Sequence, residues 1–98
     1  MLFHVMFEFT DPTEAGERRS LAVLAEWQPP AGTELIDWYG FADNTGGVAI
    51  IEVDGAAALT ELTAVWMPWC RFTATPIVPI QERVAIATAA IAFRDSVS

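Results

Sequence analysis

The sequence predicts an α+β fold of the ferredoxin-like type, in the order β-α-β-β-α-β with an added C-terminal helix. Three observations predict it: short apolar runs, longer stretches with apolar residues three and four apart, and Pro, Gly and Asn clusters between them. This order gives an antiparallel four-stranded sheet with its first and third strands in the centre and two helices on one face. The chain length fits a single domain over residues 1–98, with residues 81–95 as the added helix.

The first predicted strand, residues 2–9, is apolar on one face and mixed on the other. Successive side chains of a strand point to opposite faces. One face therefore carries Phe3, Val5, Phe7 and Phe9, and the other carries Leu2, His4, Met6 and Glu8. A mixed second face favours a sheet that is covered on both sides. We therefore expect two sheets to pack face to face, as in a dimeric α/β barrel.

Turn and cap signals set the other predicted elements. Asp11-Pro12-Thr13 is typical of a helix start, and Pro29-Pro30 of a helix end. Asp54 is a candidate cap for the next helix, and the Gly-rich segment 43–47 predicts a hairpin turn. The predicted helices span 13–27, 56–67 and 81–95, and the predicted strands after the first span 34–42, 48–53 and 71–78.

Composition points to a homodimer in the cytoplasm. The chain is 53% hydrophobic, with four Trp and six Phe, which is more apolar surface than a small monomer easily buries. A net charge of −8 without any lysine argues against nucleic acid and membrane surfaces as partners. The single Cys70 fits a reducing compartment. The apolar run 84–93 is too short to span a bilayer, and no signal peptide is expected.

Strand parity predicts a candidate site on the barrel face. If Phe3 and its alternates face the helices, His4, Met6 and Glu8 face the barrel. We expect a register that pairs His4 with Glu52, which would place Met6 opposite Ile50 and Glu8 opposite Val48. The last strand then contributes Arg71, Thr73 and Thr75, with Arg71 near Glu8. On the strand 34–42, sequence alone leaves the choice between Trp38 and Tyr39 open.

This cluster suits proton-transfer chemistry on a small molecule. His4 is the candidate base, and Glu52 would orient it. Arg71 would contact an anionic oxygen, since its guanidinium matches carboxylates and enolates. The candidate ligand-binding residues are Glu8, Arg71, Thr73, Met6 and Trp38. A structural interpretation competes with this one, in which Glu8 and Arg71 form a cross-strand salt bridge and His4 is an interface residue.

Other cofactor signals are weak. One histidine and one cysteine do not predict a structural zinc site, and Gly46-Gly47 is typical of a turn, not a phosphate loop. Trp66 and Trp69 resemble a cofactor-stacking patch, but we interpret them as core residues. We therefore expect no metal and no cofactor.

Several segments resemble a family of short bacterial proteins of unknown function. The resemblance covers about residues 1–80 and rests on Met1-Leu2-Phe3-His4-Val5, Pro29-Pro30-Ala31-Gly32, Trp38-Tyr39-Gly40-Phe41-Ala42-Asp43 and the segment 69–79. It implies membership of the dimeric α/β-barrel superfamily, whose members include cofactor-free monooxygenases, muconolactone isomerase and haem-handling enzymes. A shared architecture does not transfer a function.

Three functional hypotheses follow. The first is a cytoplasmic homodimer that binds a small apolar or aromatic molecule, with His4 as base of a cofactor-free isomerase or monooxygenase. The second is a non-catalytic dimeric module with a filled barrel that binds a ligand or a protein. The third is a redox or haem carrier, which would be coloured.

Overall fold

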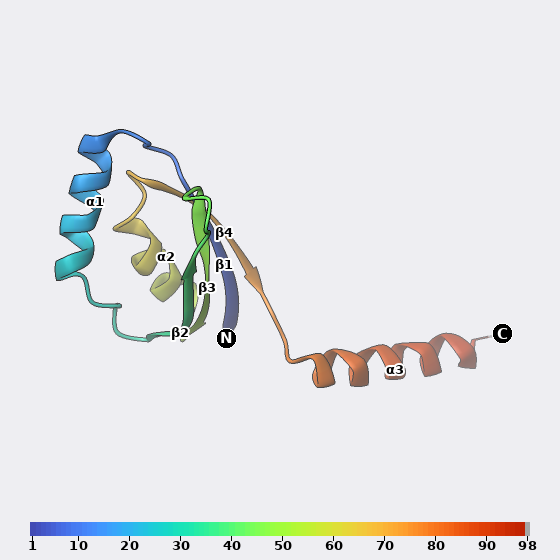
Figure 1. Cartoon of the computed structure of the whole chain (residues 1–98). Coiled ribbons are helices and arrows are strands. Elements are labelled where there is room, and N and C mark those ends of the chain that lie inside the picture. Colours follow the sequence, from blue (N-terminus) through green and yellow to red (C-terminus); the bar gives the residue numbers. More distant parts are fainter. Residues whose placement is uncertain (98) are drawn as a thin grey trace.

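The computed structural model describes residues 1–97, which fold as four strands and three helices. This confirms the α+β class and the order of the elements (Figure 1). The elements are β1 (Leu2–Phe9), α1 (Glu14–Glu26), β2 (Thr33–Gly40), β3 (Gly46–Val53), α2 (Ala56–Ala64), β4 (Cys70–Pro76) and α3 (Ile80–Ser96).

Several boundaries differ from the prediction. The strand β3 begins at Gly46, two residues earlier than expected, whereas β2 and β4 each end two residues early. The helix α2 ends at Ala64 instead of continuing to Met67, because residues 65–69 form a turn ahead of β4.

The strands form an antiparallel sheet in the order β2-β3-β1-β4. The first and third strands lie in its centre, as the sequence predicted. Figure 1 shows α1 and α2 on one side of the sheet, which we call the helix side. The opposite side, the open face, is left uncovered by the elements of residues 1–97.

The core lies on the helix side. Five apolar residues are buried there, and they come from the two central strands and α2: Val5, Ala49, Ile51, Val53 and Leu62. Val5 is 1% exposed, so the odd-numbered residues of β1 face the helices. The parity predicted for β1 is therefore confirmed, and its even-numbered residues lie on the open face.

The helix caps predicted from the sequence are confirmed for α1 but not for α2. Thr13 is the N-cap of α1, and its hydroxyl accepts a hydrogen bond of 3.1 Å from the Gly16 N–H. Asp54 does not cap α2, which begins after Gly55 without a side-chain cap. The Asp54 carboxylate instead lies beside Gly32, a residue with a φ of +81° that favours glycine.

The helix α3 forms where the sequence predicts it, but it projects away from the rest of the chain (Figure 1). No residue of α3 is buried, so packing on its own sheet edge, one of the two positions expected, is wrong for the single chain. The other position, on a partner subunit, stays a prediction. Within residues 1–97, no helix combines the length and apolar character needed to cross a membrane.

Candidate functional site

The open face gathers most of the predicted site residues along β1 and β4. Glu8 lies opposite Arg71, Met6 opposite Thr73 and His4 opposite Thr75. The predicted position of Arg71 at the Glu8 end of the sheet is therefore confirmed. No ion pair joins Glu8 to Arg71 in the part of the chain that the structure describes.

The register between β1 and β3 differs from the prediction by two residues. His4 lies opposite Ile50, and Glu52 lies opposite Leu2. The expected pairs of Met6 with Ile50 and Glu8 with Val48 are wrong for the same reason, since Met6 pairs with Val48 and Glu8 with Gly46. The cause is that Gly46 and Gly47 belong to the strand instead of the turn. A shift of two keeps every side chain on its predicted face.

Glu52 therefore has a different partner from the one expected. The amino group of Met1 forms an ion pair with the Glu52 carboxylate and also donates to the Val53 carbonyl oxygen at 2.9 Å. His4 has Thr75 and Ile50 as its cross-strand neighbours. The register therefore does not place His4 opposite Glu52, as a base and its orienting carboxylate would require.

A β-bulge in β2 decides the choice between Trp38 and Tyr39. The register shifts between Leu35 and Asp37, so Ile36 is an extra residue without a partner in β3. Beyond the bulge Trp38 pairs with Ala49, on the helix side, and Tyr39 pairs with Val48, on the open face. Trp38 is therefore not a residue of the open face, contrary to its predicted role there.

A large cavity that the sequence did not predict lies on the helix side, between the two helices and the sheet. Its volume is about 880 Å³, and residues of β1, α1, β2, β3, α2 and β4 line it. Seven aromatic residues contribute to the lining: Phe7, Phe9, Trp27, Trp38, Trp66, Trp69 and Phe72. The surplus of Trp and Phe in so short a chain was the signal that could have indicated it.

The tryptophans form a connected series along the cavity. Trp27 packs edge to face on Trp38 and on Trp66, with ring centroids 5.9 and 5.4 Å apart. Trp66 in turn meets Trp69 at 6.3 Å. Such edge-to-face pairs are stabilising and hold the rings in defined orientations. They join the end of α1 to β2 and to the turn after α2.

Apolar side chains of α1 line the cavity without closing it. Leu21 and Leu24 line the cavity, yet they remain 57% and 38% exposed. An amphipathic helix normally buries such residues against its sheet. The space beneath α1 is therefore not filled by the side chains of this chain.

A smaller set of polar groups lines the cavity near the end of β1 and the start of α1: Asp11, Glu17, Ser20, Asn44 and Thr45. Asp11 accepts hydrogen bonds from the hydroxyl and N–H of Thr13 at 2.5 and 3.1 Å, which lower the pKa of its carboxyl. Two acidic side chains at this end, Asp11 and Glu17, disfavour an anionic ligand.

Cys70 also lines the cavity, at the first residue of β4. Burial raises the pKa of its thiol, which makes the thiolate scarcer at neutral pH. Nothing in this environment activates it as a nucleophile. Across residues 1–97, no three His, Cys, Asp or Glu side chains come together as a group suited to hold a metal ion.

Comparisons with known proteins give one informative result. A search among curated proteins gives no match. A family model, described as a domain of unknown function, matches residues 1–91 and so spans the sheet, α1, α2 and most of α3. The chain belongs to this family, DUF3303.

Proposed function

We propose that the protein is a homodimer that binds a small, largely apolar or aromatic organic molecule, neutral or cationic, in the cavity beneath α1. The observation that carries this proposal is the aromatic lining of that cavity. Its volume of about 880 Å³ lies within the range of about 300–1,000 Å³ that is usual for small-molecule sites. Its few polar groups gather at one end, where they would orient a ligand.

Exposed apolar side chains support a ligand over an empty space. Leu21, at 57% exposed, gains little from folding in the unliganded chain. A ligand that fills the cavity would remove Leu21 and Leu24 from water, and each Å² of apolar surface removed contributes about 25 cal/mol. The carboxylates of Asp11 and Glu17 would favour a neutral or cationic ligand over an acid.

The proposal is tested with N-phenyl-1-naphthylamine, an uncharged aromatic probe whose emission rises in apolar sites. We expect saturable binding, energy transfer from the tryptophans, and loss of binding in Leu21→Trp, which fills the cavity. Ala22→Trp is the matched control, because Ala22 is exposed and is not part of the cavity lining. Equal binding by both variants, or no binding by the wild type, would contradict the proposal.

The open face supports the homodimer. Leu2, Met6, Val48 and Ile50 lie there beside ionisable residues, and none of the four is fully buried in the single chain. The order β2-β3-β1-β4 supports a ferredoxin-like sheet, and two such sheets packed by their open faces would form a dimeric α/β barrel. With this assignment we also propose a bacterial, cytoplasmic protein, for which the lone Cys70 is a suitable feature.

A second candidate function is catalysis at the open face. It is favoured by the position of His4, which lies on that face next to Thr75, with Arg71 on the same face four register pairs further along β4. In this hypothesis His4 acts as the base of a cofactor-free isomerase or monooxygenase, and Arg71 binds an anionic oxygen. The non-catalytic alternative keeps the same dimer with a barrel filled by side chains.

The two candidates give different responses in an NMR titration of the single histidine. Catalysis at the open face predicts that a bound ligand shifts the His4 ring resonances, and that Leu21→Trp leaves this response intact. Binding beneath α1 predicts the reverse, with His4 unaffected and the response of the tryptophans lost in Leu21→Trp.

A further inference from the structure

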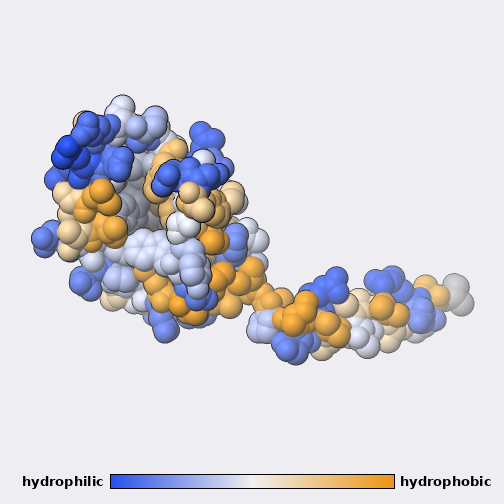
Figure 2. Space-filling view, viewed as in Figure 1, coloured by the Kyte–Doolittle hydropathy of each residue, from blue (hydrophilic) through white to orange (hydrophobic). Residues whose placement is uncertain are grey.

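The helix α3 carries more apolar surface than an isolated helix can leave in water. Its residues at spacings of three and four form two apolar rows, with Arg83 and Arg94 between them. These rows are Ile80, Val84, Ala87 and Ile91, and Ile86, Ala90 and Phe93. Ile86 is 60% and Phe93 70% exposed. Figure 2 shows this apolar surface along the projecting helix, apart from the body of the molecule.

The dimensions of the chain also indicate a missing partner surface. The radius of gyration is 17.9 Å, against about 13 Å for a compact domain of this length. The accessible surface is 7020 Å², about 1,500 Å² more than the roughly 5,500 Å² expected for a folded monomer of this mass. A standard interface buries about 800 Å² on each partner. The excess is therefore large enough for a stable dimer.

The position of α3 points to a particular partner. Within residues 1–97, the last backbone hydrogen bond from this segment to the sheet runs from the Ile77 N–H to the Leu2 carbonyl oxygen, at 2.9 Å. After Pro79 the helix extends on the side away from α1 and α2, which is the side of the open face (Figure 1). A second copy that covers the open face would therefore lie alongside α3.

The distribution of charge along the chain also favours the packing of α3 on a second copy. Residues 1–79 contain eleven Asp and Glu and three Arg, which gives a net charge of −8. Residues 80–98 contain two acidic residues and two Arg, which gives zero. Two acidic bodies repel one another, whereas a neutral helix with Arg83 and Arg94 on its apolar side meets an acidic body without that penalty.

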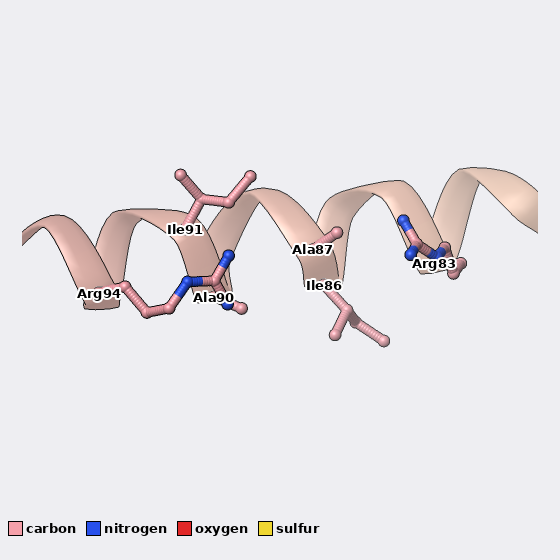
Figure 3. A pocket seen from close by; sticks show the side chains of 6 residues that line it. All are labelled: Arg83, Ile86, Ala87, Ala90, Ile91 and Arg94. Atoms are coloured by element: carbon pink, nitrogen blue, oxygen red, sulfur yellow. The ribbon is translucent and has the colours of Figure 1, made fainter.

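We propose that α3 is a clasp that packs on a second copy of this chain and holds the homodimer together. The inference rests on the homodimer proposed above. The side of α3 that the two apolar rows flank faces the partner, with the small side chains of Ala87 and Ala90 allowing close approach. Figure 3 shows Ile86 and Ile91 pointing to opposite sides of the helix, with these two alanines between them along the chain. Each subunit would thus cover apolar surface of the other.

The test compares Ala90 and Ala92, two alanines on opposite sides of α3, in the chain of residues 1–98. Ala90→Glu puts a charge on the apolar side, and Ala92→Glu puts the same charge on the opposite side, where the neighbouring residues are Ala85 and Ser96. By sedimentation equilibrium we expect Ala90→Glu to raise the dimer dissociation constant at least tenfold, and Ala92→Glu to change it less than twofold. Hydrogen exchange of the α3 amides should slow on dimerisation in the wild type and in Ala92→Glu only.

The outcomes separate the clasp from the dimer. A wild-type chain that stays monomeric at every concentration would overturn both. A dimer of equal affinity in both variants, with α3 amides that exchange as fast as in a free helix, would overturn the clasp alone. Protection of α3 that is independent of protein concentration would also overturn it, because the helix would then be packing on its own subunit.

Discussion

The ring of Trp66 meets that of Trp27 edge to face, with centroids 5.4 Å apart and an interplanar angle of 76°. Trp27 is the C-cap of α1, and Trp66 lies in the turn after α2. This contact therefore anchors the C-terminal end of α1, while the helix itself contributes Glu17, Ser20, Leu21 and Leu24 to the cavity lining. The contact between these two rings therefore supports one end of the cavity.

Replacing Trp66 with Ala should remove its contact with Trp27. We expect a loss of about 2 kcal/mol in the free energy of unfolding, less than for a fully buried Trp because Trp66 is only half-buried. Urea denaturation followed by circular dichroism measures the change. Met67→Ala is the control, since Met67 is 68% exposed and its loss should cost less than about 0.5 kcal/mol. Similar costs for the two variants would contradict the anchoring role.

Gly47 should not tolerate a side chain. A methyl group there would overlap the Phe7 ring and the Tyr39 carbonyl oxygen, so either the ring or the β2–β3 pair must shift. We expect Gly47→Ala to lower the free energy of unfolding by about 1–3 kcal/mol. Gly40→Ala serves as a strand control, because its methyl group would come no closer than 3.9 Å to a neighbour. Thermal unfolding of both variants would show whether only Gly47 has this constraint.

Local patterns were enough to predict the elements and the face of each β1 residue. Alternation along Phe3, Val5 and Phe7 defines a helix side whatever the register, because side chains repeat every two residues. The register between β1 and β3 was not predictable, since Gly46 and Gly47 suit a turn and a strand equally well in sequence. Only the packing of Phe7 over Gly47 shows why they extend β3.

The site was harder to predict than the fold. The bulge at Ile36 moves Trp38 from the open face to the helix side, and nothing in the local sequence marks that extra residue. The cavity depends on the distance between α1 and the sheet, a tertiary property that periodicity along a helix does not contain. Trp66 and Trp69 were predicted to be core residues, whereas the structure places both of them half-buried in the lining of the cavity.

Cys70 should report on the occupancy of the cavity. Because burial raises the pKa of its thiol, a smaller fraction is thiolate at pH 8 than in a free cysteine. We therefore expect iodoacetamide to react several-fold more slowly with the folded protein than with the urea-unfolded chain. The aromatic probe should slow the reaction further in the wild type but not in Leu21→Trp. A rate independent of the probe would place the probe outside the cavity.

Asp11 should make the stability of the protein depend on pH at acidic values. Hydrogen bonds from Thr13 lower its carboxyl pKa in the folded state below the ordinary value of 3.8. The carboxylate thus contributes stability that is fully present above that ordinary pKa and is lost as pH falls through the lowered one. We expect the urea midpoint of the wild type to fall more steeply than that of Asp11→Asn below about pH 4.

A second variant separates this effect from helix capping. Thr13→Val removes the hydroxyl that donates to Asp11 and also the cap of the Gly16 N–H, so it should cost about 1 kcal/mol at neutral pH. It should also flatten the acidic slope, as Asp11→Asn does. If Asp11→Asn keeps the wild-type slope, another carboxylate must cause the acid sensitivity, because asparagine cannot titrate.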